Sequence, residues 1–294
     1  MVTLTRPEGT EATDLHLSRR GVAGLFFAGY ALAGLSAQAA PIHTSTEGLV
    51  TEEVMLAAPD RAIPAYVARP AGAGRYGAVI VASEIFGIHE YIKDVCRRLA
   101  HEGYVAIAPA FFVRAGDPAP LTDFAEIRRI VGAASDTQVM GDVGAALTFL
   151  GRQRYVDARR VAITGFCWGG AVVWLACEQF PQIKAGAAWY GRLAPPAGAP
   201  ADPNRLWPIQ RVAGLTAPVL GLYAGRDAIT AAVPAMRAAL AAAGKTGSEI
   251  VVYPDASHGF HADYRAGYDA SAATNGWARM LSHFGRNGAA PGRR

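Results

Sequence analysis

Short apolar runs alternate with helix-like stretches along most of this 294-residue chain. The apolar runs have the length of buried strands and lie at residues 76–83, 104–109, 160–164, 185–190, 219–223 and 249–253. The helix-like stretches between and after them lie at residues 89–102, 121–151, 168–180, 233–243 and 268–284. Because continuous apolar strands separated by helices form parallel sheets covered on both faces, this alternation predicts an α/β fold.

Two further runs, residues 52–59 and 62–70, precede the alternation and are joined by Asp60-Arg61. Their spacing predicts a β-hairpin at one edge of the sheet. We therefore expect a mostly parallel central sheet with helices on both faces and an N-terminal antiparallel hairpin. The length suits a single domain, which we place at residues 40–294, with a Gly/Pro/Arg-rich tail after residue 285 that we expect to fray.

The first 39 residues have the pattern of an export signal. Ser18-Arg19-Arg20 precedes an uncharged stretch at residues 21–35, and Ala37-Gln38-Ala39 provides a small-x-small cleavage site. The uncharged stretch is shorter than the roughly 20 residues that cross a bilayer, which favours a processed signal over the alternative, an anchoring helix. The paired arginines resemble a twin-arginine signal. We therefore expect a periplasmic or secreted protein without a stable membrane span after processing.

Charge and composition limit the classes of partner. The chain has 28 basic and 24 acidic residues, a formal net charge of +4, and its arginines are scattered rather than clustered. This pattern argues against nucleic-acid binding, which needs a basic stripe or patch. No metal-ligand signature or phosphate-binding loop is present, so we expect no metal, no cofactor, and a monomer whose partner is a small-molecule substrate.

Three cysteines, an odd number without a CxxC pair, argue against a disulfide framework or a structural zinc site. Cys96 and Cys177 lie in apolar, helix-like patterns that are typical of buried thiols. Cys167 instead lies in Gly165-Phe166-Cys167-Trp168-Gly169-Gly170, between a predicted strand and a predicted helix. This is the nucleophile-elbow pattern G-x-S-x-G with cysteine in place of serine. The alternative is a Gly-rich turn with a buried cysteine at its apex.

Asp227 and His258 supply the other two residue types of a catalytic triad. Asp227 follows the predicted strand at 219–223, and His258 follows the one at 249–253. The order nucleophile, acid, histidine is the one found in α/β-hydrolases. Taken singly, Asp227 could cap a helix near Thr230 and His258 could merely pack. Together, the three positions favour a triad that converges at the ends of three strands.

The chemistry assigns a role to each of these residues. Cys167 attacks an acyl carbon as a thiolate, His258 accepts and returns a proton, and Asp227 fixes the imidazole tautomer. We expect the backbone N–H groups of Trp168 and Ile85 to form the oxyanion hole. The sequence thus predicts a cysteine-dependent hydrolase that forms an acyl-thioester intermediate.

Four motifs together resemble the dienelactone hydrolase (carboxymethylenebutenolidase) family over roughly residues 52–284. They are Ser83-Glu84-Ile85-Phe86-Gly87, the cysteine elbow, Gly225-Arg226-Asp227 and His258-Gly259-Phe260-His261. In that family a glutamate after an early strand interacts with the resting thiol and helps to convert it to thiolate. The resemblance therefore implies this role for Glu84, and an α/β-hydrolase fold acting on a small ester or lactone.

The resemblance also implies residues that bind substrate. Family members that act on dienelactone hold its carboxylate with two arginines, and Arg114 matches the first. The second position is Ala262 here, and Arg265 nearby is the candidate replacement. The remaining candidates for the substrate pocket are Phe86, His261 and Tyr264.

Two other functions stay open at this point. A general carboxylesterase or thioesterase could use the same fold and triad, because neither sets the acyl group. A non-catalytic binding domain that kept the fold is the third reading, which the three triad residue types disfavour.

Overall fold

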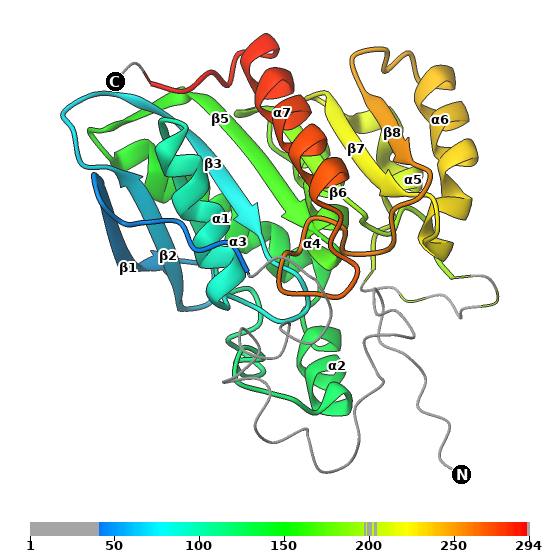
Figure 1. Cartoon of the computed structure of the whole chain (residues 1–294), viewed down its shortest axis with the longest axis horizontal. Coiled ribbons are helices and arrows are strands. Elements are labelled where there is room, and N and C mark those ends of the chain that lie inside the picture. Colours follow the sequence, from blue (N-terminus) through cyan, green and yellow to red (C-terminus); the bar gives the residue numbers. More distant parts are fainter. Residues whose placement is uncertain (1–40, 197, 199–201, 203–204, 293–294) are drawn as a thin grey trace.

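The computed structural model describes residues 41–196, 198, 202 and 205–292 (Figure 1). The predicted export signal lies outside this part of the chain. Eight strands form one sheet, in the order β1-β2-β4-β3-β5-β6-β7-β8. They are β1 (Leu49–Ala57), β2 (Ala62–Pro70), β3 (Tyr76–Ala82), β4 (Tyr104–Pro109), β5 (Val156–Phe166), β6 (Ile183–Trp189), β7 (Val219–Ala224) and β8 (Glu249–Tyr253).

The pairing of the strands confirms the predicted sheet. β1 and β2 form an antiparallel hairpin, and β2 also runs antiparallel to β4. From β4 to β8 every neighbouring pair is parallel. The central strands β3 and β4 are buried along their whole length, as continuous apolar runs covered on both faces require.

Helices cover both faces of the sheet (Figure 1), with α1 and α7 in front of it and α3 and α4 behind. The helices are α1 (Glu90–His101), α2 (Phe124–Gly132), α3 (Asp136–Arg152), α4 (Trp168–Gln179), α5 (Pro208–Arg211), α6 (Val233–Ala242) and α7 (Ala270–Arg286). Two short 3-10 helices follow α5 and β7, at Val212–Gly214 and Ala228–Ala232. In Figure 1, α2 lies beyond the carboxyl ends of the central strands, where ligands bind in open α/β sheets.

The helical region predicted at residues 121–151 consists of two helices, α2 and α3, and capping side chains explain where each begins. Asp123 accepts a 2.9 Å hydrogen bond from the N–H of Ala125 at the start of α2. Ser135 accepts one of 3.2 Å from the N–H of Gln138 at the start of α3. Because such side chains satisfy N–H groups that have no partner within the helix, each favours a new helix start.

The C-terminal tail is hydrogen-bonded to the sheet, which corrects the expectation that it frays. The hydroxyl of Tyr104 donates to the carbonyl of Ala289, and Arg160 donates to the carbonyl of Pro291, at 3.0 and 2.8 Å. The N–H of Gly292 donates to the carbonyl of Gly103 at 2.9 Å. These three hydrogen bonds join backbone groups of the tail to β4, to β5 and to Gly103 just before β4. They hold residues 289–292 on the sheet.

Candidate active site

Cys167 lies at the sharp turn between β5 and α4. Its backbone has φ +54° and ψ −116°, a conformation that non-glycine residues rarely adopt. The N–H of Cys167 donates a 3.0 Å hydrogen bond to the carbonyl of Trp189, which fixes the turn to the end of β6. The thiol is therefore held at the N-terminus of a 12-residue helix, where the helix dipole favours a thiolate.

The glycines that follow Cys167 are required by close approach of backbone. A Cβ on Gly169 would lie 2.6 Å from the carbonyl oxygen of Ser83, and one on Gly170 would lie 2.7 Å from that of Trp189. No side chain fits at such distances, so only glycine lets α4 begin this close to β3 and β6. This is the physical reason for the glycine pattern of the elbow.

His258 and Asp227 form a hydrogen-bonded pair at the ends of neighbouring strands. His258 Nδ1 lies 2.5 Å from Asp227 Oδ2, and the imidazole is 2% exposed. The other carboxylate oxygen, Oδ1, accepts a 3.0 Å hydrogen bond from the N–H of Ile229. Asp227 thus both caps the 3-10 helix Ala228–Ala232 and fixes the imidazole, so the two sequence interpretations of this residue are compatible.

Glu84 follows β3 and is completely buried. Its Oε2 accepts a 2.7 Å hydrogen bond from the hydroxyl of Tyr264 and lies 3.3 Å from His89 Nε2. Its Oε1 lies 4.0 Å from Arg265 Nη1. Burial alone would raise the pKa of Glu84, but His89, the charge of Arg265 and the hydrogen bond from Tyr264 together hold it below its usual value. Glu84 is therefore a buried carboxylate that stays ionised.

Cys167, Asp227, His258 and Glu84 come after β5, β7, β8 and β3. These strands are mutually parallel, so their carboxyl ends lie along one edge of the sheet. The structure thus places all four predicted catalytic residues along the same edge. Tyr190, which follows β6, packs its ring 5.0 Å from that of His258.

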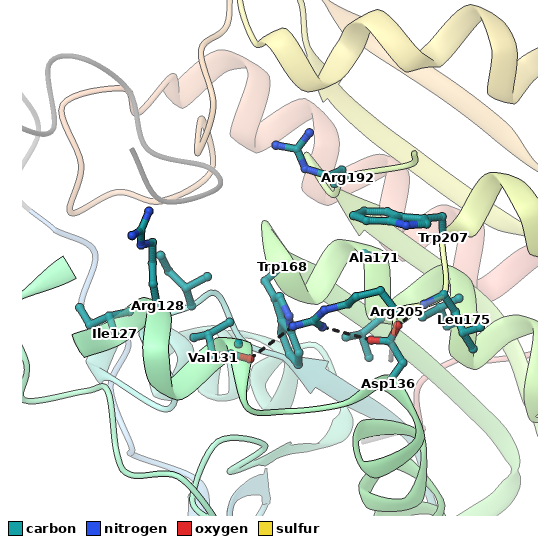
Figure 2. A pocket seen from close by; sticks show the side chains of 14 residues that line it. Ile127, Arg128, Val131, Asp136, Trp168, Ala171, Leu175, Arg192, Arg205 and Trp207 are labelled. Atoms are coloured by element: carbon teal, nitrogen blue, oxygen red, sulfur yellow. Dashed lines mark hydrogen bonds and ion pairs between the residues drawn. The ribbon is translucent and has the colours of Figure 1, made fainter. Parts of the chain in front are cut away.

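A cavity of about 260 Å³ opens beside the elbow (Figure 2). Ile85 and Trp168, whose N–H groups are the predicted oxyanion donors, both line it. The other lining residues are mostly apolar and come from α2, the start of α3, α4, the segment after β6 and the segment before α5. They are Ile127, Arg128, Val131, Gly132, Asp136, Ala171, Val172, Leu175, Arg192, Arg205, Leu206 and Trp207. The cavity therefore extends from the predicted oxyanion hole along the outer side of α4.

Three arginines in this lining were not predicted as site residues. Arg205 donates to Asp136 Oδ1 at 3.2 Å and to the carbonyl of Val131 at 3.4 Å, as the dashed lines in Figure 2 show. Arg128 comes from α2, and Arg192 follows β6. Distant segments bring these arginines to one cavity wall, and no local sequence motif marks them.

A comparison with protein families places the chain. The sequence model described as the dienelactone hydrolase family matches residues 63–288. The chain belongs to the dienelactone hydrolase family. As a member of this family, the chain is an α/β-fold hydrolase that acts on ester or lactone bonds. The family resemblance inferred from four sequence motifs is therefore confirmed.

Individual relatives agree with this membership. A Methylorubrum extorquens protein named "Putative carboxymethylenebutenolidase" is 45% identical over 285 residues, covering 95% of this chain and 96% of the relative. An Escherichia coli protein of the same name is 42% identical over 267 residues, with coverages of 88% and 96%. The crystal structure of a "Putative Dienelactone Hydrolase" from Klebsiella pneumoniae is 44% identical, has a TM-score of 0.76, and covers 81% of this chain and 99% of that one.

Arg114, the predicted carboxylate-binding arginine, forms ion pairs with two carboxylates of the protein. Its guanidinium donates to both oxygens of Asp142 at 2.8 Å and to Asp60 Oδ2 at 2.8 Å. It lines a smaller separate cavity with Phe111 and Phe112, not the one beside Trp168. Two carboxylates of the protein itself thus occupy the planar fork that a substrate carboxylate would use, and the substrate-binding role of Arg114 stays a prediction.

Two other predicted pocket residues, His261 and Arg265, are not among the residues that line the cavity beside Trp168. His261 is 2% exposed and packs among aromatic rings, with its Nδ1 2.6 Å from the hydroxyl of Tyr91. Burial and the charge of Arg98 hold its pKa well below the usual value, so it is a neutral core residue rather than part of the pocket lining. Arg265 is buried beside Glu84, so its charge faces a carboxylate of the protein itself.

Phe86 and Tyr264 stay close to the predicted site. Phe86 makes edge-to-face contacts with Phe124 of α2 and with His89, and Tyr264 binds Glu84 as described. Neither is among the residues that line the cavity beside Trp168. Their contact with substrate stays a prediction.

Cys96 and Cys177 are fully buried, and burial raises the pKa of both thiols, as expected for structural cysteines. Within the described residues, no group of three or more potential metal ligands comes together. In the same part of the chain, no helix is both long and apolar enough to cross a membrane.

Proposed function

We propose that this protein is a cysteine-dependent hydrolase of a small ester or lactone, with Cys167, His258 and Asp227 as its triad. One observation carries the proposal: a cysteine strained at φ +54° begins α4, on the sheet edge that also carries a buried His258–Asp227 pair. A strained residue persists only where the surrounding structure imposes it, and such residues cluster at functional sites. The names of the relatives support an ester or lactone as the substrate.

The geometry supports a two-step mechanism. The Cys167 thiolate attacks the acyl carbon, and the negative charge on its oxygen is stabilised by the N–H groups of Trp168 and Ile85. His258 protonates the leaving alcohol, which leaves an acyl thioester on Cys167. Water, deprotonated by His258, then attacks the thioester and releases the acid.

Asp227 and Glu84 support the two reacting groups in different ways. Asp227 Oδ2 binds His258 Nδ1, which leaves Nε2 as the nitrogen for proton transfer and stabilises the imidazolium that forms. Glu84 is held ionised at the same sheet edge, and we propose that it assists conversion of the thiol to thiolate when substrate binds.

Hydrolysis of a small panel tests the proposal. The panel is dienelactone, p-nitrophenyl acetate and an acetyl thioester, assayed with the wild type and with Cys167→Ala. We expect the variant to lose at least about a thousandfold in rate, since it lacks the nucleophile. Cys177→Ala, which removes a buried thiol elsewhere on α4, is the matched control and should keep its activity.

The panel also separates the alternatives. Preference for dienelactone supports a lactonase, and preference for the acetate or thioester supports a general carboxylesterase or thioesterase. Mass spectrometry of a His258→Gln sample incubated with p-nitrophenyl acetate should find an acyl adduct on Cys167, because p-nitrophenolate can leave without a proton from His258, whereas deacylation needs the base. Turnover of no compound, with no adduct on Cys167, would favour a binding domain that kept the fold.

We also propose that residues 1–39 direct export through the twin-arginine route. The support is the arginine pair, the short uncharged stretch and the small-x-small site in the sequence. A reporter fused to these residues should reach the periplasm, and the paired change Arg19→Lys/Arg20→Lys should retain it in the cytoplasm. Equal export of both fusions would contradict the proposal.

A further inference from the structure

His89 is a partly exposed side chain that reaches the buried carboxylate of Glu84. Its Nε2 lies 3.3 Å from Glu84 Oε2, and 18% of its side chain is exposed, against 0% for Glu84. Because an ionised carboxylate only accepts hydrogen bonds, the imidazole donates from Nε2 in this contact. Burial raises the pKa of Glu84, and His89 is the strongest of the partners that lower it. Glu84 thus depends on a partner that solvent reaches.

The place of His89 in the fold shows that its side chain does not serve the helix that it begins. His89 is the N-cap residue of α1, a position where serine, threonine, aspartate or asparagine commonly accepts a hydrogen bond from a free N–H group. The His89 side chain accepts no such bond. The imidazole is instead bonded to Glu84, so a capping contact is absent where a contact with the site is present.

Three aromatic rings hold the imidazole in this orientation. Its ring centroid lies 5.1 Å from that of Tyr264 and 6.0 Å from that of Phe86, both in edge-to-face contact. Tyr91 stacks on it at 5.8 Å. Tyr264 also donates to the oxygen that His89 contacts, Glu84 Oε2. Two separate segments of the chain, the start of α1 and the segment before α7, therefore hold the same oxygen.

The two oxygens of Glu84 consequently have different surroundings. Oε2 accepts the bonds from His89 and Tyr264. Oε1 forms no hydrogen bond within the described residues and lies 4.0 Å from Arg265 Nη1. A proton taken up by the carboxylate goes to the oxygen whose lone pairs are free, which is Oε1. The bonds to Oε2 thus fix which oxygen can act as a base.

We propose that His89 is a positioning residue of the hydrolase, which through its bond to Oε2 keeps Glu84 ionised and leaves Oε1 to accept the proton of the Cys167 thiol. The step moves that proton from Sγ to Oε1 and leaves a thiolate on Cys167. His89 acts on the reaction only through Glu84. This inference rests on the proposed function, and specifically on the role of Glu84 in forming the thiolate.

Two substitutions at position 89 separate this role from packing. His89→Phe keeps a ring for the contacts with Phe86, Tyr91 and Tyr264 but removes the donor. His89→Gln removes the ring, but its amide keeps an N–H donor for Oε2. His89→Phe should lower kcat for p-nitrophenyl acetate by about tenfold or more, the loss expected for one hydrogen bond to a charged group, with KM nearly unchanged. His89→Gln should recover most of that loss, and equal kcat values in the two variants or the reverse order would overturn the proposal.

His101→Phe provides the matched control. His101 lies at the other end of α1, and its Nε2 lies 2.9 Å from the carbonyl of Ser45. This variant therefore also removes one imidazole contact from α1, but not one to Glu84. It should keep the wild-type kcat, and thermal melts of all the variants check the fold. A loss in His101→Phe equal to that in His89→Phe would assign the effect to α1 as a whole and overturn the proposal.

Alkylation by iodoacetamide keeps this inference separate from the proposed hydrolysis. The reagent reacts with the thiolate and needs no ester, and mass spectrometry locates the label on Cys167. His89→Phe should be alkylated about tenfold more slowly than the wild type, and His89→Gln at a rate closer to that of the wild type. This result would support the role of His89 even if no ester were hydrolysed. Equal alkylation rates in the three proteins would overturn it even if esters were hydrolysed.

Discussion

The hydroxyl of Tyr264 donates a 2.7 Å hydrogen bond to Oε2 of Glu84, joining residues 180 positions apart in the sequence. Glu84 follows β3, a central strand of the sheet, and Tyr264 lies on the segment between His258 and α7. The bond therefore ties the segment that carries the triad histidine to the loop that supplies Ile85. A hydrogen bond to a buried charge is worth more than one between neutral groups, so this contact has a measurable role.

Tyr264→Phe should remove the hydrogen bond to Glu84, and so destabilise its ionised form, without changing the fold. Loss of a hydrogen bond to a carboxylate costs about 1.5 to 3 kcal/mol and leaves Glu84 less favourable as an ion. We expect the pKa of Glu84 to rise, kcat for p-nitrophenyl acetate to fall about tenfold, and KM to change little. Stopped-flow alkylation of Cys167 by iodoacetamide across a pH series should show the altered thiol activation directly.

Tyr268→Phe is the control for this prediction. Tyr268 lies on the same segment, but its phenol interacts electrostatically with Asp263 and Arg98 rather than with Glu84. It should keep the wild-type kcat and alkylation profile. If both variants behaved alike, the effect would come from the segment as a whole, and the specific role of the Tyr264–Glu84 bond would be wrong.

Gly169→Ala should disrupt the elbow. The new Cβ would meet the carbonyl oxygen of Ser83 at 2.6 Å, and backbone cannot move aside as a flexible side chain can. Overpacking of this kind costs about 1 to 3 kcal/mol or more, so both the urea midpoint and kcat should fall. Gly151→Ala is the matched control: its Cβ meets nothing within 4 Å in α3, so it should be neutral or stabilise by up to about 1 kcal/mol.

Protonation of His261 should contribute to acid sensitivity of the fold. Its pKa lies well below 6.5 in the folded protein because of burial and the charge of Arg98, whereas the unfolded chain binds the proton near pH 6.5. The unfolded state then binds more protons below pH 6.5, so the free energy of unfolding falls as pH drops through that value. The contribution is fully present above pH 6.5, and the slope for one such group is at most about 1.4 kcal/mol per pH unit.

His261→Gln tests this contribution. Glutamine does not titrate and can still pair with the hydroxyl of Tyr91, so urea unfolding between pH 7.5 and 5 should show a smaller loss of stability than in the wild type. Part of the slope should persist, since burial also lowers the pKa of His283. An unchanged slope in His261→Gln would contradict the assignment.

Most of the fold could be predicted because its signals are local. β4 and β8 have the predicted bounds, since charged or turn-forming residues flank each apolar run. β5 begins earlier than predicted, at Val156, because Asp157 forms ion pairs with Arg159 and Arg160 that let charged residues enter the strand. The short helix α5 has only one turn and no periodicity to detect.

The substrate residues were harder to predict because their roles depend on tertiary partners. Arg114 matches a family position in sequence, but Asp60 and Asp142 lie against it in space. Arg128 and Arg192 carry no motif, and only the tertiary packing of α2 and of the segment after β6 brings them to one cavity wall. The positions around Cys167 could be predicted because the strand-to-helix turn requires glycine at Gly169 and Gly170. A cavity wall imposes no such requirement on residue type.

The ion pair between Arg114 and Asp142 offers a last test of this distinction between structural and substrate-binding arginines. Asp142 is completely buried, so Arg114→Met would leave its charge without its guanidinium partner, a change that typically costs about 3 to 5 kcal/mol. Urea unfolding should show this loss, and the double variant Arg114→Met/Asp142→Leu should recover most of it by removing the isolated charge. If Arg114 is structural, any folded Arg114→Met enzyme should keep its KM for mono-p-nitrophenyl glutarate. The acyl chain of this ester ends in a carboxylate, which p-nitrophenyl butanoate lacks. A tenfold rise in KM for the glutarate, with KM for the butanoate unchanged, would instead support Arg114 as a substrate-binding residue.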